Sequence, residues 1–337
     1  MTALRAFSRG HPHPRAHRQC GAALLAAMLT VMLVATFSAA ALWQQWRASE
    51  VEAAERGRVQ AAWVLIGALD WSRLILREDG LTGGPDHLAE PWAVPLAEAR
   101  LTSFLSAEKN VASDNLEGLP DAFLSGRIVD AQSKLNVLSL VDGNKPVPAS
   151  IATFTKLFNI LGLPASELSA MTASLVRALA TGTDAAGGDA GAAPLMPQEV
   201  SQLVWLGLSP STVAALEPYV TILPIRTPLN INTASAEAIS ASLPSLSISD
   251  ARQLVEKRTR SYFKQIADAN AALPSNGTPF NAGQHSVSTQ FFEVYGRLRL
   301  DRTWVEERSL LQRDGVTVKT IWRNRGAGLA TATPAKP

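Results

Sequence analysis

The fold of this chain is decided by HRQCG, residues 17–21, and by the apolar run that follows it, AALLAAMLTVMLVATFSAAAL, residues 22–42. A basic tail changes there, within one residue, into a segment that has no charge, no Gly and no Pro. At about 1.5 Å per residue, a helix over this run reaches roughly 31 Å, the thickness of a bilayer's hydrocarbon core. Residues 22–42 are therefore predicted to be a transmembrane helix.

The residues before this run determine the predicted topology. Arginines stand at four positions of the N-terminal segment and no Asp or Glu accompanies them; they are Arg5, Arg9, Arg15 and Arg18. The positive-inside rule keeps residues 1–21 in the cytoplasm and sends the remainder across the membrane. The sequence thus predicts a single-pass protein whose bulk is extracytoplasmic.

Three interpretations of the junction compete. A cleaved secretory signal would have a shorter apolar stretch of about 7 to 15 residues before a small-residue cleavage site, although Ala39-Ala40-Ala41 could serve as one. A plain signal anchor fits the length of the segment. The third is a type IV prepilin signal, which the Arg-rich leader and the Gly directly before the helix resemble.

The prepilin resemblance assigns roles to single residues. In that family the peptidase cuts after the Gly, here Gly21, and leaves Ala22 as an N-terminus that is then methylated. Most members carry a glutamate five residues into the mature chain, where this sequence has Ala26. A carboxylate inside a membrane is expensive and is retained to neutralise the terminal amine of a neighbouring subunit. A subunit with Ala26 cannot make that contact.

Composition and motifs exclude several classes of function. With 31 basic and 29 acidic residues, the chain has no electrostatic footprint for nucleic acid. Cys20 is the only cysteine and lies in the predicted leader, so the processed chain can form no disulfide. The five His residues form no metal-ligand spacing, and no phosphate-binding or nucleophile motif occurs. We therefore expect neither an enzyme nor a bound cofactor.

The apolar spacing of the first helix continues beyond the membrane segment. Helical periodicity places six apolar residues near one face, namely Val51, Ala54, Ala62, Ile66, Leu69 and Leu74, and predicts a helix to about Glu78. Trp63 and Trp71 are interpreted as core packing.

Strand patterns flank a long helical middle. SGRIVDAQSKLN, residues 125–136, alternates in the manner of an exposed edge strand, and Asp142-Gly143-Asn144 is a turn signal. Near the C-terminus, residues 288–301 and 308–322 read as strands, with Asp314-Gly315 as a hairpin turn. Four helices are predicted between these regions, at residues 151–163, 165–181, 198–208 and 210–220.

Residues 228–258 are predicted to form a helix-hairpin-helix unit. Asn232-Thr233-Ala234-Ser235 offers helix-capping oxygens before one helix, and Ser247 with Asp250 makes a capping-box pattern before the next. DNA-binding versions use a Gly-rich hairpin so that backbone N–H groups can approach a phosphate. The hairpin here, Pro244-Ser245-Leu246-Ser247, contains no Gly. The architecture is thus expected without its phosphate-binding chemistry.

Several of these motifs, taken in order, resemble one family. SGRIVDAQSKLN is similar to its strand pattern G-R-[LI]-x-D-x-Q-x-[RK]-[FL]-N, LNINTASAEAI to its N-[VI]-N-T-A-S helix start, and the ending F-F-x-V before Arg-Asp-Gly also fits. The family is the type II secretion minor pseudopilin K, or general secretion pathway protein K, whose members characteristically lack the membrane glutamate. Each motif is weak alone, whereas four in order behind the membrane signal are specific.

The resemblance implies an α+β fold with a long N-terminal transmembrane helix, a pilin-like antiparallel sheet and a large inserted all-α domain. The expected regions, in chain order, are a leader at 1–21, the transmembrane part at 22–42, a pilin-like α/β domain at 43–145 and 286–326, an inserted helical domain at 146–285, and a disordered tail at 327–337. The inserted domain is expected to consist of two small subdomains, the second of them helix-hairpin-helix-like.

The same resemblance implies function and partners. It predicts a non-enzymatic subunit of the bacterial inner membrane, at the tip of a periplasmic pseudopilus, that starts or caps the fibre used to export folded proteins. The implied partners are other minor pseudopilins in a tip complex, the major pseudopilin, the prepilin peptidase and the inner membrane, without nucleic acid. The alternatives are a membrane-anchored helix-hairpin-helix nucleic-acid-binding protein, a signal-anchored periplasmic interaction domain and a periplasmic hydrolase.

Calcium is the one metal that the resemblance raises. Family members often carry an acidic loop in the inserted domain, and related structures hold calcium there. The corresponding stretch, ALATGTDAAGGDAGAAP, leaves only Asp184 and Asp189 as candidate ligands. Because calcium prefers six to eight oxygen ligands, a strong site in this loop is not expected. The missing cysteines likewise exclude a disulfide seen in some relatives.

Overall fold

The structure is a computed structural model that describes residues 20–102, 122–180, 193–274, 277–300 and 303–327. The chain divides into two compact units, Met1–Val59 and Gln60–Pro337, which are treated separately below. The predicted tail from residue 328 onward lies outside the described residues.

The first unit contains the start of helix α1 (Cys20–Thr82). Within the described residues, this is the one helix long and apolar enough to cross a membrane, with a mean hydropathy of 2.2 over its most apolar window and none of that window buried. Two tryptophans of the same unit, Trp43 and Trp46, are exposed. The helix ends four residues beyond the predicted Glu78, so the prediction of one long helix is confirmed.

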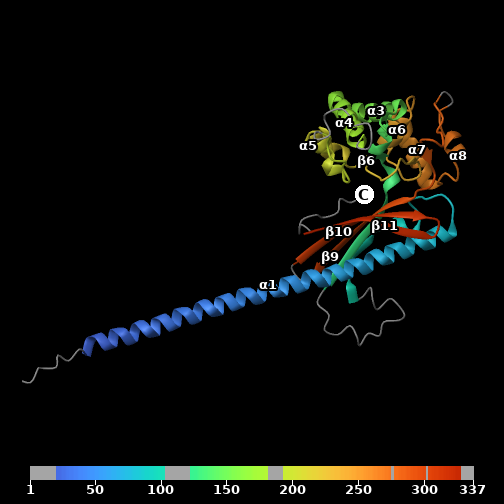
Figure 1. Ribbon diagram of the computed structural model, residues 1–337. Coiled ribbons are helices and arrows are strands. Elements are labelled where there is room, and N and C mark those ends of the chain that lie inside the picture. The colour runs from blue at the N-terminus through green and yellow to red at the C-terminus, as the bar shows by residue number, and fades with distance from the viewer. Residues whose placement is uncertain (1–19, 103–121, 181–192, 275–276, 301–302, 328–337) are drawn as a thin grey trace, which may run out of the picture. The chain divides into compact units, whose positions relative to one another are not determined.

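The second unit is built on a five-stranded antiparallel sheet in the order β1-β2-β9-β10-β11 (Figure 1). The strands are β1 (Leu96–Arg100), β2 (Ala122–Asp130), β9 (Phe291–Leu300), β10 (Thr303–Asp314) and β11 (Thr317–Ala327). Gly315 joins the last two strands at a φ of 57°, a left-handed conformation that glycine adopts without strain. The predicted Asp314-Gly315 hairpin is therefore confirmed.

The prediction of an exposed edge strand is wrong. Strand β2 lies between β1 and β9, and the segment after it forms a 3-10 turn, η3 (Ala131–Ser133). Asp130 and Gln132 are only 1% and 2% exposed. Their alternation with apolar residues suggested a solvated face, but the helical domain, which returns to the sheet from far along the sequence, covers them.

From Gln60 onward, α1 packs along one face of the sheet (Figure 1). Its buried residues recur at spacings of three and four; they are Ala61, Leu65, Leu69, Ser72 and Leu76. Gly296 of β9 permits the close approach, because a Cβ there would lie 3.1 Å from Leu65 Cδ2. Of the predicted apolar face, Leu69 is buried but Leu74 is 51% exposed, and Trp63 is 69% exposed. The interpretation of Trp63 as a core residue is wrong.

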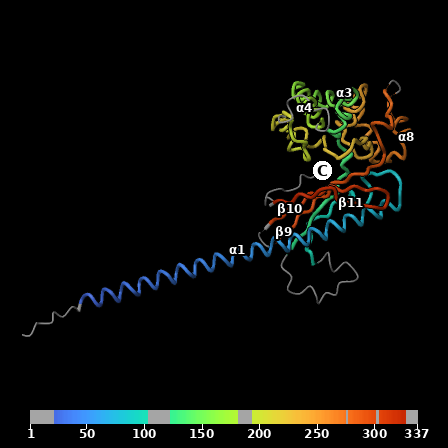
Figure 2. Tube along the Cα trace, viewed as in Figure 1, coloured from blue at the N-terminus to red at the C-terminus, as the bar shows by residue number. Residues whose placement is uncertain are grey.

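The helical domain surrounds a single apolar core. Its helices are α3 (Pro148–Leu161), α4 (Ala165–Leu179), η5 (Val200–Leu206), α5 (Pro210–Leu216), α6 (Ala236–Ser242), α7 (Ile248–Arg260) and α8 (Ile266–Asn270). Short segments complete it or join it to the sheet: η4 (Val137–Leu140), β3 (Leu135–Asn136), β4 (Val141–Asp142), β5 (Lys145–Pro146), β6 (Val220–Thr221), β7 (Leu229–Asn230) and β8 (His285–Ser286). The short helix η1 (Pro91–Ala93) follows α1 instead, and its Trp92 packs into the core between α1 and the sheet. The second unit is thus a sheet with α1 on one face and the helical domain on the other (Figure 2).

Local signals account for several helix ends. Gly162 follows α3 at a φ of 67°, and its N–H bonds back to Asn159 O and Phe158 O. The Oγ atoms of Ser235 and Ser247 accept from the N–H groups of Ala238 and Asp250, which caps α6 and α7 as predicted. The helix-hairpin-helix unit predicted at residues 228–258 is present.

Candidate functional site

The predicted processing residues lie in the first turns of α1. Gly21, Ala22 and Ala26 are helical and exposed, and no atom lies within 4 Å of the place that a Cβ on Gly21 would occupy. The peptide bond from Gly21 to Ala22 therefore lies within the first turn of a helix that begins at Cys20. The four arginines of the predicted leader lie outside the described residues.

The outer face of α1 in the second unit remains apolar at its surface. Trp63, Gly67 and Leu74 are exposed on the side of the helix that does not pack on the sheet. A Cβ on Gly67 would meet nothing within 4 Å. We name these residues, together with Asp70, the outer face of α1. A bare helix backbone beside a large aromatic side chain suits the close approach of another helix.

A buried polar junction joins the sheet to the helical domain. Asp130, at the end of β2, accepts hydrogen bonds from Gln132 N at 2.7 Å, Asn230 Nδ2 at 2.8 Å and Thr233 Oγ1 at 2.5 Å. Gln132 also accepts from Gln290 N at 2.7 Å. The residues come from the SGRIVDAQSKLN and LNINTASAEAI motifs. The two motifs are therefore far apart in the sequence but meet at one carboxylate.

Two further asparagines of these motifs hold loops in place. Asn136 donates to Ile225 O at 2.7 Å and accepts from Leu223 N. Asn232 donates to Phe263 O and accepts from Phe263 N, both at 2.9 Å. Each amide thus satisfies both a donor and an acceptor of the backbone, which accounts for an Asn at these positions in structural terms.

The junction carboxylate is costly to keep ionised. Complete burial raises the pKa of Asp130 to about 6, although the donors from Thr233 and Asn230 act in the opposite direction. Burial also raises the pKa of Asp86, while the neighbouring Arg313 guanidinium acts to lower it. Because both pKa values are raised in the folded chain, protonation of Asp130 and Asp86 stabilises the folded state relative to the unfolded state.

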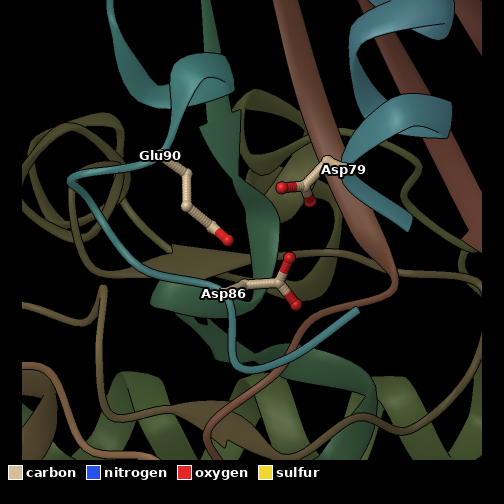
Figure 3. Close-up of side chains that lie close together, drawn as sticks. All are labelled: Asp79, Asp86 and Glu90. Carbon is tan, nitrogen blue, oxygen red and sulfur yellow. The ribbon is translucent and has the colours of Figure 1, made fainter. Parts of the chain in front are cut away.

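Three carboxylates gather at the end of α1: Asp79, Asp86 and Glu90 (Figure 3). Arg313, from the end of β10, pairs with both Asp79 and Asp86 and donates to Thr289 O at 3.2 Å. Glu90 accepts from Trp92 Nε1 at 2.7 Å and from His87 N at 2.8 Å. Burial raises the pKa of Glu90 to about 7. These acidic groups hold an arginine and the backbone, so their arrangement is that of an ion-pair clasp.

This clasp lines a cavity of about 210 Å³ that also includes Ser288 and Gln290. Calcium requires six to eight oxygens, and the guanidinium of Arg313 already neutralises two of the three carboxylates. The weak calcium candidates Asp184 and Asp189 lie outside the described residues. Sequence reasoning missed the clasp because Arg313 is more than two hundred residues away from the carboxylates that it pairs with.

The hairpin between α6 and α7 is not arranged to receive a phosphate. Its tip residue Ser245 hydrogen-bonds to Thr278 N at 2.8 Å, so the segment around Thr278 covers it. Three of its carbonyl oxygens, from Leu243, Pro244 and Leu246, face Lys156. The described hairpin therefore presents acceptors where a phosphate would require donors.

A buried serine and histidine lie together beneath this hairpin. Ser242 Oγ donates to Ile239 O at 2.8 Å and lies 3.0 Å from His285 Nε2. His285 Nδ1 lies 3.2 Å from Asn281 N and 3.3 Å from Asn281 O, so both ring nitrogens have hydrogen-bond partners inside the core. Burial lowers the pKa of His285 to about 4. The serine proton does not point at the histidine, so the pair is a core hydrogen bond and not an activated nucleophile.

Two family models match the helical part of the chain. Both carry the description Type II secretion system (T2SS), protein K; one matches residues 133–225 and the other residues 229–288. The first range begins at η3, and the second contains the helix-hairpin-helix unit and ends before β9.

Full-length relatives match as well. Type II secretion system protein K of Pseudomonas aeruginosa is 27% identical over 331 residues, covering 92% of this chain and 94% of the relative. The protein of the same description from Klebsiella pneumoniae is 27% identical over 337 residues, covering 92% and 97%. A chain of the crystal structure of the GspK-GspI-GspJ complex from the enterotoxigenic Escherichia coli type 2 secretion system has a similar fold, with a TM-score of 0.60, 20% identity, and coverage of 81% of this chain and 98% of that chain.

Proposed function

This chain belongs to the type II secretion system protein K family, and we propose that it acts at the tip of the pseudopilus as a minor pseudopilin that starts or caps the fibre. The observation that carries the proposal is Ala26, at the position where most pilin-like subunits have a glutamate. Because the side chain is a methyl group, the subunit cannot neutralise the terminal amine of a neighbour inside the membrane. A subunit that lacks this contact suits the end of a fibre better than its interior.

The inserted domain supports the same position. The described part of residues 146–285 packs around one core together with residues 135–141 and covers the sheet face opposite α1 (Figure 1). The insertion adds well over a hundred residues to a pilin-like sheet, and this bulk is hard to accommodate between stacked subunits. At the tip it has free space.

We propose other minor pseudopilins as the partners at this tip. The Escherichia coli structure is that of a complex of GspK with GspI and GspJ. The outer face of α1 supports an equivalent contact, since Trp63 is 69% exposed beside the open backbone at Gly67. The major pseudopilin would then contact the assembled tip.

Localisation and processing follow from the same proposal. The apolar start of α1 is consistent with a single-pass anchor. We place it in the inner membrane with the N-terminus in the cytoplasm and the second unit in the periplasm, after prepilin peptidase has cut between Gly21 and Ala22. The role requires no catalytic group, no cofactor and no nucleic acid, and we assign none.

The tip position can be tested by labelling. An epitope tag in the helical domain, combined with overproduction of the major pseudopilin, should give fibres labelled at one end. A second fibre population, tagged on the major pseudopilin, serves as the control for labelling along the shaft. Label on this chain distributed along the fibre would contradict the proposal.

A further inference from the structure

The ammonium of Lys156 lies in a cradle of backbone carbonyl oxygens. Lys156 projects from α3, and its Nζ donates to Leu243 O at 2.7 Å, Pro244 O at 3.2 Å and Leu246 O at 2.6 Å. The side chain is half-buried. All three acceptors belong to the five residues between α6 and α7, 243–247, so one ammonium binds three of the carbonyl oxygens of this turn.

The geometry of the hairpin explains why these oxygens converge. Leu243 caps α6 in an extended conformation, and the last carbonyls of a helix have no partner within it. The chain turns back at once, because Leu246 N bonds to Leu243 O at 3.3 Å and Ser240 Oγ bonds to Leu246 O at 3.0 Å. The C-terminal end of a helix carries partial negative charge, which adds to the field of the carbonyls. The turn therefore forms a site of negative potential built from oxygen atoms.

Carbonyl oxygens arranged around a point are the ligands by which proteins bind alkali and alkaline-earth cations. We propose that the α6–α7 hairpin is a monovalent-cation site that this chain fills with its own ammonium, Lys156. Occupied in this way, the site fixes α3, in the segment that the first family model matches, to the helix-hairpin-helix unit that the second model matches. Burial lowers the pKa of Lys156 from its ordinary value, as expected for an ammonium withdrawn from water. The inference stands independently of the tip position proposed above.

The test removes the ammonium and supplies a cation. In Lys156→Ala the cradle is open, whereas in Lys156→Met a neutral side chain of similar length fills it. Thermal unfolding of the full chain in detergent is followed in chloride salts of potassium, ammonium, lithium and choline at one ionic strength. In choline we expect the Tm of both variants to lie about 5 °C below that of the wild type, since three charge-assisted hydrogen bonds are lost.

The expected result is selective rescue. Potassium or ammonium should restore at least half of the lost Tm in Lys156→Ala in a saturable manner, and neither salt should act on Lys156→Met or on the wild type. The same Tm for Lys156→Ala and the wild type in choline would overturn the proposal. So would a response to potassium that is equal in all three proteins, because it would be an effect of salt elsewhere.

A measurement on the wild type keeps the proposal testable if Lys156→Ala does not fold. Acylation of amines, quantified by mass spectrometry, should modify Lys156 at least ten times more slowly than the exposed Lys145, because its ammonium is held by three acceptors. Equal rates at the two lysines would show that Nζ is not held in the cradle and would overturn the assignment.

Discussion

Asp130 accepts the hydrogen bonds that hold the polar junction together. Because its pKa is higher in the folded chain than in the unfolded chain, it makes the free energy of unfolding depend on pH. Its pKa of about 6 in the folded chain lies above the value of 3.8 that an exposed Asp has, so the folded state binds the proton more tightly. The stabilisation is complete below about pH 4 and is lost as the pH rises through 6. Over that window we expect the free energy of unfolding to fall by about 3 kcal/mol on account of Asp130.

Chemical denaturation of the wild type and of Asp130→Asn between pH 4 and pH 7 measures this effect. The variant should be less stable at every pH, because an amide donor would face the donors of Asn230 and Thr233. Its curve should nevertheless be flatter than that of the wild type in this window. Parallel curves would mean that Asp130 does not titrate there.

A pair of glycines in α1 gives a second prediction at the scale of single residues. A Cβ on Gly80 would lie 2.5 Å from Gly315 O, a backbone atom in the turn between β10 and β11. Gly80→Ala should therefore separate the end of α1 from that turn and destabilise the chain by about 1–3 kcal/mol. Gly67→Ala is the matched control on the same helix, since its Cβ would meet nothing. It should raise stability by about 0.5–1 kcal/mol in thermal unfolding, and equal effects of both changes would contradict the packing argument.

The sequence predicts the role of a residue when its hydrogen-bond partners lie within a few positions of it. Ser235 and Ser247 cap helices within three residues of their own positions, and the sequence identifies Ser247 and the stretch 232–235 that contains Ser235. Asp130 and Arg313 could not be assigned in this way. One is buried by a domain that follows in the sequence, and the other pairs with carboxylates more than two hundred residues away. The alternation of residues along a strand carries no information about partners that are so distant in the sequence.

At the scale of elements, two faces of α1 have different neighbours. One face packs on the sheet, and the outer face of α1 is the one proposed to contact other minor pseudopilins. Leu65 is 2% exposed against the sheet, and Trp63 is 69% exposed on the outer face. Leu65→Ala should lower the free energy of unfolding by about 2–5 kcal/mol. Trp63→Ala should change it by less than about 0.5 kcal/mol and yet reduce co-purification with other minor pseudopilins. Unchanged co-purification of Trp63→Ala would remove the outer face from the proposed interface.

The two faces of α1 also show which properties of a helix its apolar periodicity can predict and which it cannot. The sequence predicts that α1 is one long helix and estimates its end to within four residues, because length and the absence of Pro are local properties. The apolar residues, however, occupy more than one side of the helix, including Trp63 and Leu74. Periodicity alone cannot distinguish the side that packs on the chain's own sheet from a side left for another helix. The sheet distinguishes the two sides, because Gly296 of β9 leaves room for Leu65 of α1.

At the scale of the whole molecule, membrane insertion and domain folding are assigned to different stretches of sequence. Residues 22–42 carry the apolar run, whereas the second unit from Gln60 onward has its own sheet and cores. The predicted fold class, with a long helix, an antiparallel sheet and an inserted helical domain, is confirmed by the structure and by the similar fold of the Escherichia coli chain. The order of the elements could be predicted since each motif stands at an element boundary.

The junction between the two stretches yields the last prediction, which concerns the maturation of the entire chain. If prepilin peptidase acts on it, mass spectrometry of protein from membranes should find an N-terminus at Ala22 that carries a methyl group. Gly21→Leu should block the cut, leave the leader attached and abolish secretion, although the second unit, which has its own cores, should keep its Tm. Cys20→Ser, one residue earlier, is the matched control and should be processed normally. A wild-type chain that retains the leader, or one that begins near Leu42, would contradict the prepilin interpretation and leave a plain anchor or a cleaved signal in its place.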